Sequence, residues 1–103
     1  MQNKTLFGLP LHAIEKIRAV FRDYPEIKQV LLYGSRAMGT YRMGSDIDLC
    51  IEGEDVNYTQ LLEIENKLDD LLLPWKIDLS LRCKIENLNL IDHIHAIGIV
   101  FYP

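Results

Sequence analysis

In residues 45–53, SDIDLCIEG, every second residue from Ile47 to Ile51 is aliphatic, and this alternation constrains the fold more than any other feature of the chain. Successive side chains of a β-strand point to opposite faces, so the stretch predicts a strand with Asp46, Asp48 and Cys50 on one face. The apolar residues between them share the other face and belong to a core. Because buried charge is costly without a partner, the two carboxylates need one.

Helical and strand patterns alternate along the rest of the chain. The spacing of apolar residues predicts helices at 11–24, 57–73 and 87–98, strands at 27–34, 45–53 and 75–82, a short turn or helix at 35–44 and an apolar tail at 99–103. These elements predict an α/β (α+β) fold, a small mixed β-sheet with helices packed on it. The connection between the first two strands is too short for a crossover, so we expect them to pair antiparallel. The strand order stays open.

Length and composition limit the class of protein. A chain of 103 residues with 49% hydrophobic and 25% charged side chains predicts one folded domain, residues 1–103, and excludes a disordered chain. The net charge of −4 argues against direct binding to nucleic acid, and no apolar run predicts a membrane span. Charged side chains in the first twenty residues argue against a secretory signal, so we expect a cytoplasmic protein with Cys50 and Cys83 as free thiols.

A third carboxylate belongs to the next predicted strand. Asp78 lies on the polar face of strand 75–82, so three carboxylates are expected to converge at one edge of the sheet. Carboxylates repel one another, and Mg²⁺ held by carboxylates and substrate phosphates would relieve that repulsion. Upstream, Gly34 and Ser35 end a buried strand and open a short turn, where main-chain N–H groups and a hydroxyl are suited to phosphate.

Each of these features also has a plainer interpretation. Two acids spaced by one residue are common on exposed strands, although the Gly-Ser pair upstream favours a site. Asp78 alone needs no explanation beyond an outward strand face. Arg36 and Arg42 are either cationic donors to phosphate or ordinary surface cations. His93 and His95, two residues apart on a helix, do not share a face and are interpreted as structural.

Several of these residues resemble the motif of a known family. Gly34 and Ser35, followed after ten residues by Asp46 and Asp48, resemble the G-S-x10-D-x-D signature of the DNA polymerase β-like nucleotidyltransferases. YGSRAMGTYRMGSDIDL, KIDLSL and IDHIHAIGIVFY are similar, over nearly the whole chain, to the minimal nucleotidyltransferases (MNT), typically encoded beside a HEPN-domain toxin. This resemblance implies the nucleotidyltransferase fold, and transfer of a nucleoside monophosphate, AMP from ATP, to a hydroxyl such as a tyrosine of the HEPN toxin, which makes the chain an antitoxin.

The resemblance also implies roles for individual residues. The metal-binding and catalytic residues would be the three carboxylates, which hold two Mg²⁺ ions: Asp46, Asp48 and Asp78. Asp78 would also take the proton of the acceptor hydroxyl. The residues expected to contact the nucleoside triphosphate are the Gly-Ser pair and its polar neighbours: Gly34, Ser35, Arg36, Arg42 and Ser45.

Two classes of function remain, a catalytic nucleotidyltransferase and a non-catalytic binding module that neutralises a HEPN toxin by covering it. Clustered acids cost stability without metal, so their presence favours the enzyme. Transfer to an antibiotic or another small molecule is disfavoured, because the chain is too short for an acceptor-binding domain. Three amphipathic helices and the apolar tail predict that the chain does not work alone. We expect a complex with a HEPN protein, and a homodimer through the tail is the alternative.

Overall fold

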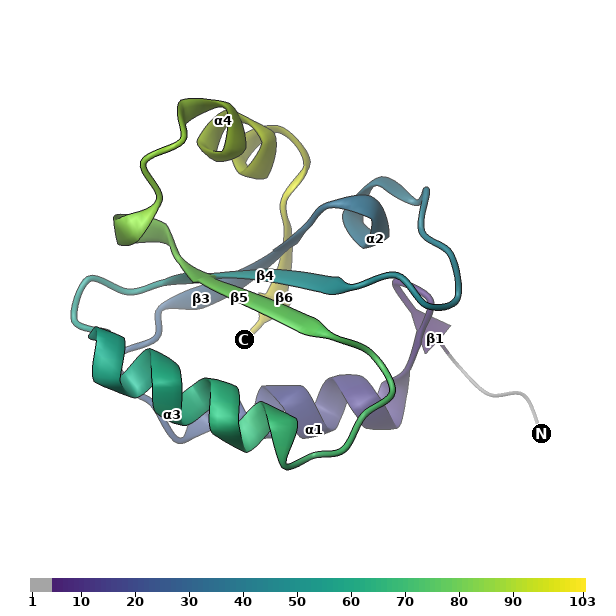
Figure 1. Ribbon diagram of the computed structural model, residues 1–103, viewed down its shortest axis with the longest axis horizontal. Coiled ribbons are helices and arrows are strands. Elements are labelled where there is room, and N and C mark those ends of the chain that lie inside the picture. The colour runs from purple at the N-terminus through teal and green to yellow at the C-terminus, as the bar shows by residue number, and fades with distance from the viewer. Residues whose placement is uncertain (1–4) are drawn as a thin grey trace.

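The computed structural model describes residues 5–103, in which a four-stranded sheet lies between helices on both faces (Figure 1). Its elements are β1 (Thr5–Leu6), β2 (Leu9–Pro10), α1 (Leu11–Arg22), β3 (Gln29–Tyr33), α2 (Ser35–Met38), β4 (Ile47–Glu52), α3 (Tyr58–Asp69), β5 (Ile77–Leu81), a 3-10 turn (Arg82–Lys84), α4 (Leu88–Ile97) and β6 (Ile99–Tyr102). All three predicted helices and all three predicted strands are present, which confirms the α/β (α+β) class.

The sheet has the strand order β5-β4-β3-β6. β3 and β4 pair antiparallel, as the short connection between them predicts. β4 and β5 are parallel and are joined through α3, because parallel neighbours need a crossover. β6 returns antiparallel to the far side of β3. The sheet is therefore mixed, and a separate two-stranded ribbon, β1 with β2, precedes α1.

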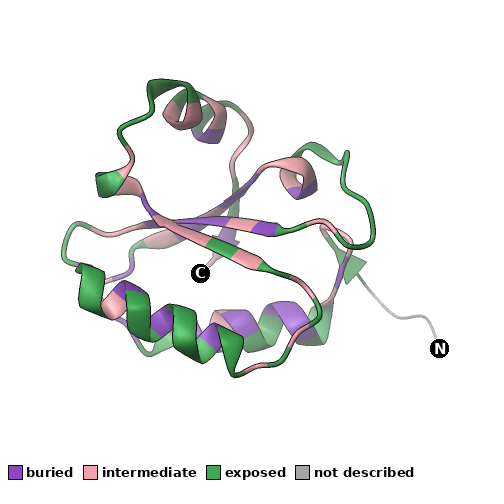
Figure 2. Ribbon diagram, viewed as in Figure 1, coloured by how far each residue is buried: buried purple, intermediate pink, exposed green. Residues whose placement is uncertain are grey.

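The helices divide between the two faces of the sheet. Figure 1 shows α1 and α3 side by side on one face and α4 on the other. The main core lies between the sheet and the first pair, and it includes the apolar residues of β4. A much smaller cluster, Tyr33, Cys50 and Ile94, lies under α4. Figure 2 shows the consequence, because α1 and α3 bury their sheet-facing sides whereas α4 stays mostly half-buried or exposed.

Local sequence signals explain where the helices begin. Asn57 accepts a hydrogen bond from the Gln60 main-chain N–H at 2.8 Å, and the Gln60 side chain accepts from the Asn57 N–H at 3.1 Å. This reciprocal pair is a capping box, and it confirms the predicted start of the second helix.

Among residues 5–103, no helix combines the length and the apolar character needed to cross a lipid bilayer.

Two sequence expectations need correction, and one is confirmed. The apolar tail is an edge strand, β6, whose Phe101 is fully buried, so part of the tail is covered by the chain itself. The second helix ends at Asp69 rather than at residue 73, and Leu72 lies beyond it, exposed and with a φ of 54°. Cys50, which is buried, and Cys83, which is exposed, are free thiols as expected.

Candidate active site

Two of the three predicted carboxylates are cross-strand neighbours. Asp48 of β4 pairs in register with Asp78 of the parallel strand β5 and with Tyr33 of β3 on its other side. Residues in register share a face, so both carboxylates belong to the face that α4 covers. Asp46 directly precedes β4 and is exposed. The structure therefore brings Asp48 and Asp78 together at one end of two adjacent strands, with Asp46 just outside β4.

Asp48 has the most perturbed carboxylate environment of this group. Burial raises the pKa of Asp48 above its ordinary value, and the neighbouring carboxylates of Asp78 and Asp46 raise it further. Lys76 opposes that rise by favouring the charged form. When neighbouring like charges disfavour the charged form of an acid, a cation bound beside the acid stabilises that charged form.

The donor set fits a hard divalent cation. Within residues 5–103, no group of three His, Cys, Asp or Glu side chains already stands in a metal-binding arrangement. The three acids offer only carboxylate oxygens, and the pKa of Asp48 is raised first by burial and then by its carboxylate neighbours. Mg²⁺ accepts oxygen ligands and keeps positions for water and substrate phosphate, so an open, all-carboxylate set suits it better than a closed protein cage.

The Gly34–Ser35 turn lies directly beside Asp48. Gly34 joins β3 to α2 with a φ of 74° and a ψ of −157°, a region that essentially only glycine occupies. A Cβ at this position would clash with Oδ2 of Asp48. The backbone therefore approaches the carboxylate as closely as it does because residue 34 has no side chain.

Hydrogen bonds show which main-chain groups of this turn are already engaged. The Gly34 carbonyl accepts from the N–H groups of Ala37 and Met38, both at 3.1 Å. The N–H groups of Ser35 and Arg36 precede these first bonds of the helix, so the geometry of α2 gives them no partner within it. Ser35 is half-buried and carries the hydroxyl of the motif.

Arg36, one of the predicted phosphate contacts, has a structural role in the loop between α2 and β4. It is only 2% exposed, and its guanidinium donates to three main-chain carbonyls. Nε and Nη2 bond to the Ser45 carbonyl at 3.1 and 2.9 Å, Nη1 to that of Phe7 at 2.9 Å, and Nη2 also to that of Met43 at 3.3 Å. The guanidinium thus holds the loop between α2 and β4, and contact of Arg36 with a nucleotide stays a prediction.

The same loop contains the other two predicted nucleotide contacts. The Ser45 hydroxyl accepts a hydrogen bond from the Arg42 main-chain N–H at 2.8 Å, which closes a turn just before Asp46. The Arg42 side chain is exposed. The Trp75 indole donates to the Met43 carbonyl at 3.1 Å and ties this loop to the start of β5. Contact of Arg42 and Ser45 with a nucleotide stays a prediction.

His93 is a residue of this region that sequence reasoning missed. From α4, its Nε2 accepts a hydrogen bond from the Gly34 main-chain N–H at 3.2 Å. Its ring packs edge-on against Tyr33, with the centroids 6.1 Å apart. The interpretation of His93 as structural rested on helical spacing alone, and no local pattern shows that α4 lies above the Gly-Ser turn. The spacing argument does hold in one respect, because His95 lies on a different side of the helix.

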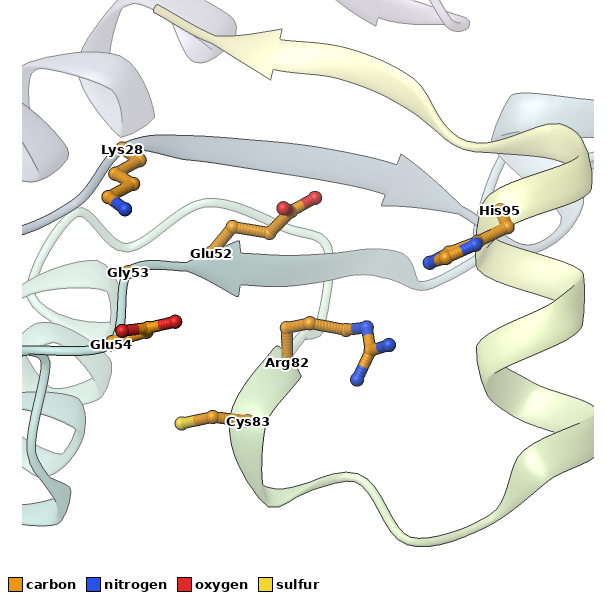
Figure 3. A pocket seen from close by; sticks show the side chains of 7 residues that line it. All are labelled: Lys28, Glu52, Gly53, Glu54, Arg82, Cys83 and His95. Carbon is orange, nitrogen blue, oxygen red and sulfur yellow. The ribbon is translucent and has the colours of Figure 1, made fainter.

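A cavity of about 350 Å³ lies at the opposite end of β4 from the Gly-Ser turn. Figure 3 shows His95 reaching toward it from α4, with Glu52 contributed by the end of β4 and Arg82 by the 3-10 turn that follows β5. Its lining mixes both signs of charge and does not favour one class of ligand. His93 and His95 therefore serve two separate regions of the α4 face.

Comparison with known proteins defines the class. The family model described as "Polymerase beta, Nucleotidyltransferase" matches residues 15–103, so the chain belongs to this family of nucleotidyltransferases, as its motifs predict. MJ1217 and MJ1379 of Methanocaldococcus jannaschii, provisionally named protein adenylyltransferases, are 32% and 30% identical to it over 75 and 76 residues. In both cases the match covers 72% of this chain and 76% of the relative.

Solved structures extend the same relationship. A chain of a toxin–antitoxin complex crystallised with AMP-PNP is 26% identical, with a TM-score of 0.70 over 85% of this chain and 71% of that one. A complex of a tri-AMPylated Shewanella oneidensis HEPN toxin with an MNT antitoxin matches in fold, with a TM-score of 0.66, 22% identity and coverage of 88% and 70%. These findings confirm the nucleotidyltransferase fold that the sequence suggested.

Proposed function

We propose that this chain, acting as one domain, transfers AMP from ATP to a tyrosine hydroxyl of a HEPN toxin and thereby acts as its antitoxin. The observation that carries the proposal is the register of Asp48 with Asp78, beside the glycine-dependent turn at Gly34. The relatives named protein adenylyltransferases and the solved complex with AMP-PNP support the same chemistry.

In this proposal Asp46, Asp48 and Asp78 hold Mg²⁺, which when bound neutralises phosphate charge and lowers the pKa of the acceptor hydroxyl. Ser35 donates from its hydroxyl and its main-chain N–H to the phosphates of ATP. Gly34 shapes the turn so that these donors lie close to the Asp48 carboxylate. Asp78, which is exposed at the edge strand, would accept the proton of an incoming tyrosine.

The acceptor comes from outside the chain. Asp78 lies on β5, an edge of the sheet, and is exposed, so a second protein can approach it from solvent. Apolar side chains elsewhere are also exposed, among them Leu88 at 73% and Val100 at 51%. A partner that covers such surface would bring its tyrosine to the carboxylates, in keeping with a complex with a HEPN protein.

Incubation with α-labelled ATP, Mg²⁺ and the product of the neighbouring gene tests the proposal. We expect label on the partner, a mass gain of one AMP per modified tyrosine, and no label with EDTA or with Asp48→Asn. Sizing chromatography of the co-expressed pair distinguishes the alternatives. Co-elution without label would identify a covering module. Absence of both label and co-elution, or a homodimer of this chain alone, would contradict the antitoxin proposal.

A further inference from the structure

Both main-chain groups of Gly34 take part in hydrogen bonds. Its carbonyl accepts from Ala37 and Met38 and begins α2, while its N–H donates to His93. Residues with unusual φ and ψ persist only where the surroundings determine them, and Gly34 is such a residue. Its N–H bond is therefore part of what determines the turn, and the partner lies far away in the sequence.

His93 is itself well oriented for this contact. α4 is capped by the Asn87 side chain, which accepts from the Leu90 N–H at 3.2 Å, and the helix is anchored by Ile94, which is 1% exposed. The imidazole packs edge-on against Tyr33 at an interplanar angle of 84°. Because Nε2 accepts a hydrogen bond, the ring carries its proton on Nδ1. The side chain is thus a preset acceptor rather than a surface group that happens to be near.

Displacement of the turn would change its relation to the carboxylates. The Gly34 backbone lies so close to Asp48 that even a Cβ would clash. A small rotation of the backbone at Gly34 therefore has one of two results. It moves the Ser35 donors away from Asp48, or it forces the Gly34 backbone against the Asp48 carboxylate. A contact that fixes the Gly34 N–H also fixes the spacing between the phosphate donors and the metal-binding carboxylate.

We propose that His93 is a positioning residue of the nucleotide site, which holds the Gly34–Ser35 turn against Asp48 through the Gly34 N–H. This inference rests on the proposed function, in which that turn binds the phosphates of ATP. It predicts that α4 contributes to nucleotide binding through this hydrogen bond without contacting the nucleotide.

A matched pair of substitutions tests the inference. In His93→Gln the Oε1 atom reaches about as far as Nε2 and can accept the Gly34 N–H, whereas in His93→Asn the acceptor is one methylene short. ATP affinity is titrated with Mg²⁺ on this protein alone, and the Gly34 amide is followed by ¹⁵N NMR shift and hydrogen exchange. His95→Asn is the control, because His95 lies on the same helix but lines the separate cavity.

We expect His93→Asn to weaken ATP binding about tenfold, as the loss of one positioned hydrogen bond does, and to speed exchange of the Gly34 amide. His93→Gln should restore both to near the unsubstituted protein, and His95→Asn should change neither. In transfer assays the Asn variant should raise KM for ATP more than it lowers kcat.

Three results would overturn the inference. Equal ATP affinity and equal Gly34 exchange in the Asn and Gln variants would show that the acceptor atom is irrelevant. A loss in His95→Asn as large as in His93→Asn would indicate a general effect on α4. If the unsubstituted protein binds no ATP, the proposed function fails as well, whereas normal binding and transfer in every variant refute only the role of His93.

Discussion

The two faces of the sheet are built by the same strands and differ in nearly every physical property. Toward α1 and α3, Ile47, Leu49 and Ile51 are at most 1% exposed and belong to a continuous core. Toward α4, Asp48 is half-buried, repelled by neighbouring carboxylates and covered by a helix with one buried residue (Figure 2). Because side chains alternate between the faces of a strand, adjacent positions of β4 have different roles, one in the core and one in the candidate site. We therefore expect substitutions on one face to change stability and those on the other to change activity.

The largest effect is expected from a substitution on the face toward α4. Asp48→Asn should lower AMP transfer by about a thousandfold or more, because the central carboxylate of the proposed metal site loses its charge. The far-ultraviolet circular dichroism should be unchanged, since the side chain keeps its size and lies outside the main core. Rates measured with labelled ATP check this. Full transfer activity in the Asp48→Asn variant would show that the face toward α4 does not hold the active site.

The next position along the strand should behave in the opposite way. Leu49→Ala should lower the free energy of unfolding by about 2–5 kcal/mol, because it opens a cavity in the core between the sheet and the two helices. Urea titration measures the change. Leu62→Ala, at an exposed position of α3, is the control and should stay within about 0.5 kcal/mol. Equal effects of the two substitutions would contradict the burial on which the comparison rests.

A smaller effect is expected at the Gly-Ser turn. Ser35→Ala should weaken ATP binding by about 1–3 kcal/mol, since a hydroxyl that donates to a charged phosphate oxygen is lost while the main-chain N–H groups remain. Calorimetric titration with ATP and Mg²⁺ measures this loss. Thr59→Ala, an exposed hydroxyl of α3, should leave affinity unchanged. If both substitutions leave it unchanged, the phosphates bind elsewhere.

The smallest effect concerns stability without metal. Because the pKa of Asp48 is raised in the folded protein, its charge opposes folding once the pH exceeds the ordinary value of 3.8. Asp48→Asn removes that charge, so at pH 7 in EDTA its Tm should equal that of the unsubstituted protein or exceed it by about 1–3 °C. The difference should shrink as the pH falls through 4. A lower Tm for the variant at pH 7 would show that the carboxylate stabilises the metal-free fold.

Local patterns predicted much of this architecture because the relevant physics is local. Alternation in residues 45–53 correctly placed Asp48 and Leu49 on opposite faces, and the spacing of apolar residues placed the starts of α1 and α3 to within a residue. Antiparallel pairing of the first two strands followed from the length of their connection. Each of these predictions needed only the geometry of a few consecutive residues.

The parts that were missed depend on contacts between distant residues. Strand order is a tertiary property, and β6 was interpreted as a tail because four residues are too few to show a period. The burial of Arg36 was missed, since the carbonyls that accept its hydrogen bonds lie in a loop and near the start of the chain. His93 looked structural because its partner, Gly34, precedes it by more than half of the chain.

The placement of β6 has a consequence for the order of events in folding. β6 pairs Leu31 with Val100, whereas β3 and β4 pair across a short connection. The entropic cost of closing a loop grows with its length, and distant pairings slow folding. We therefore expect Val100 to gain hydrogen-exchange protection after Leu49 in a pulse-labelled refolding experiment. Until β6 docks, one edge of β3 is open to pairing with another chain, so the speed of this last step limits how long the nascent sheet is exposed to aggregation.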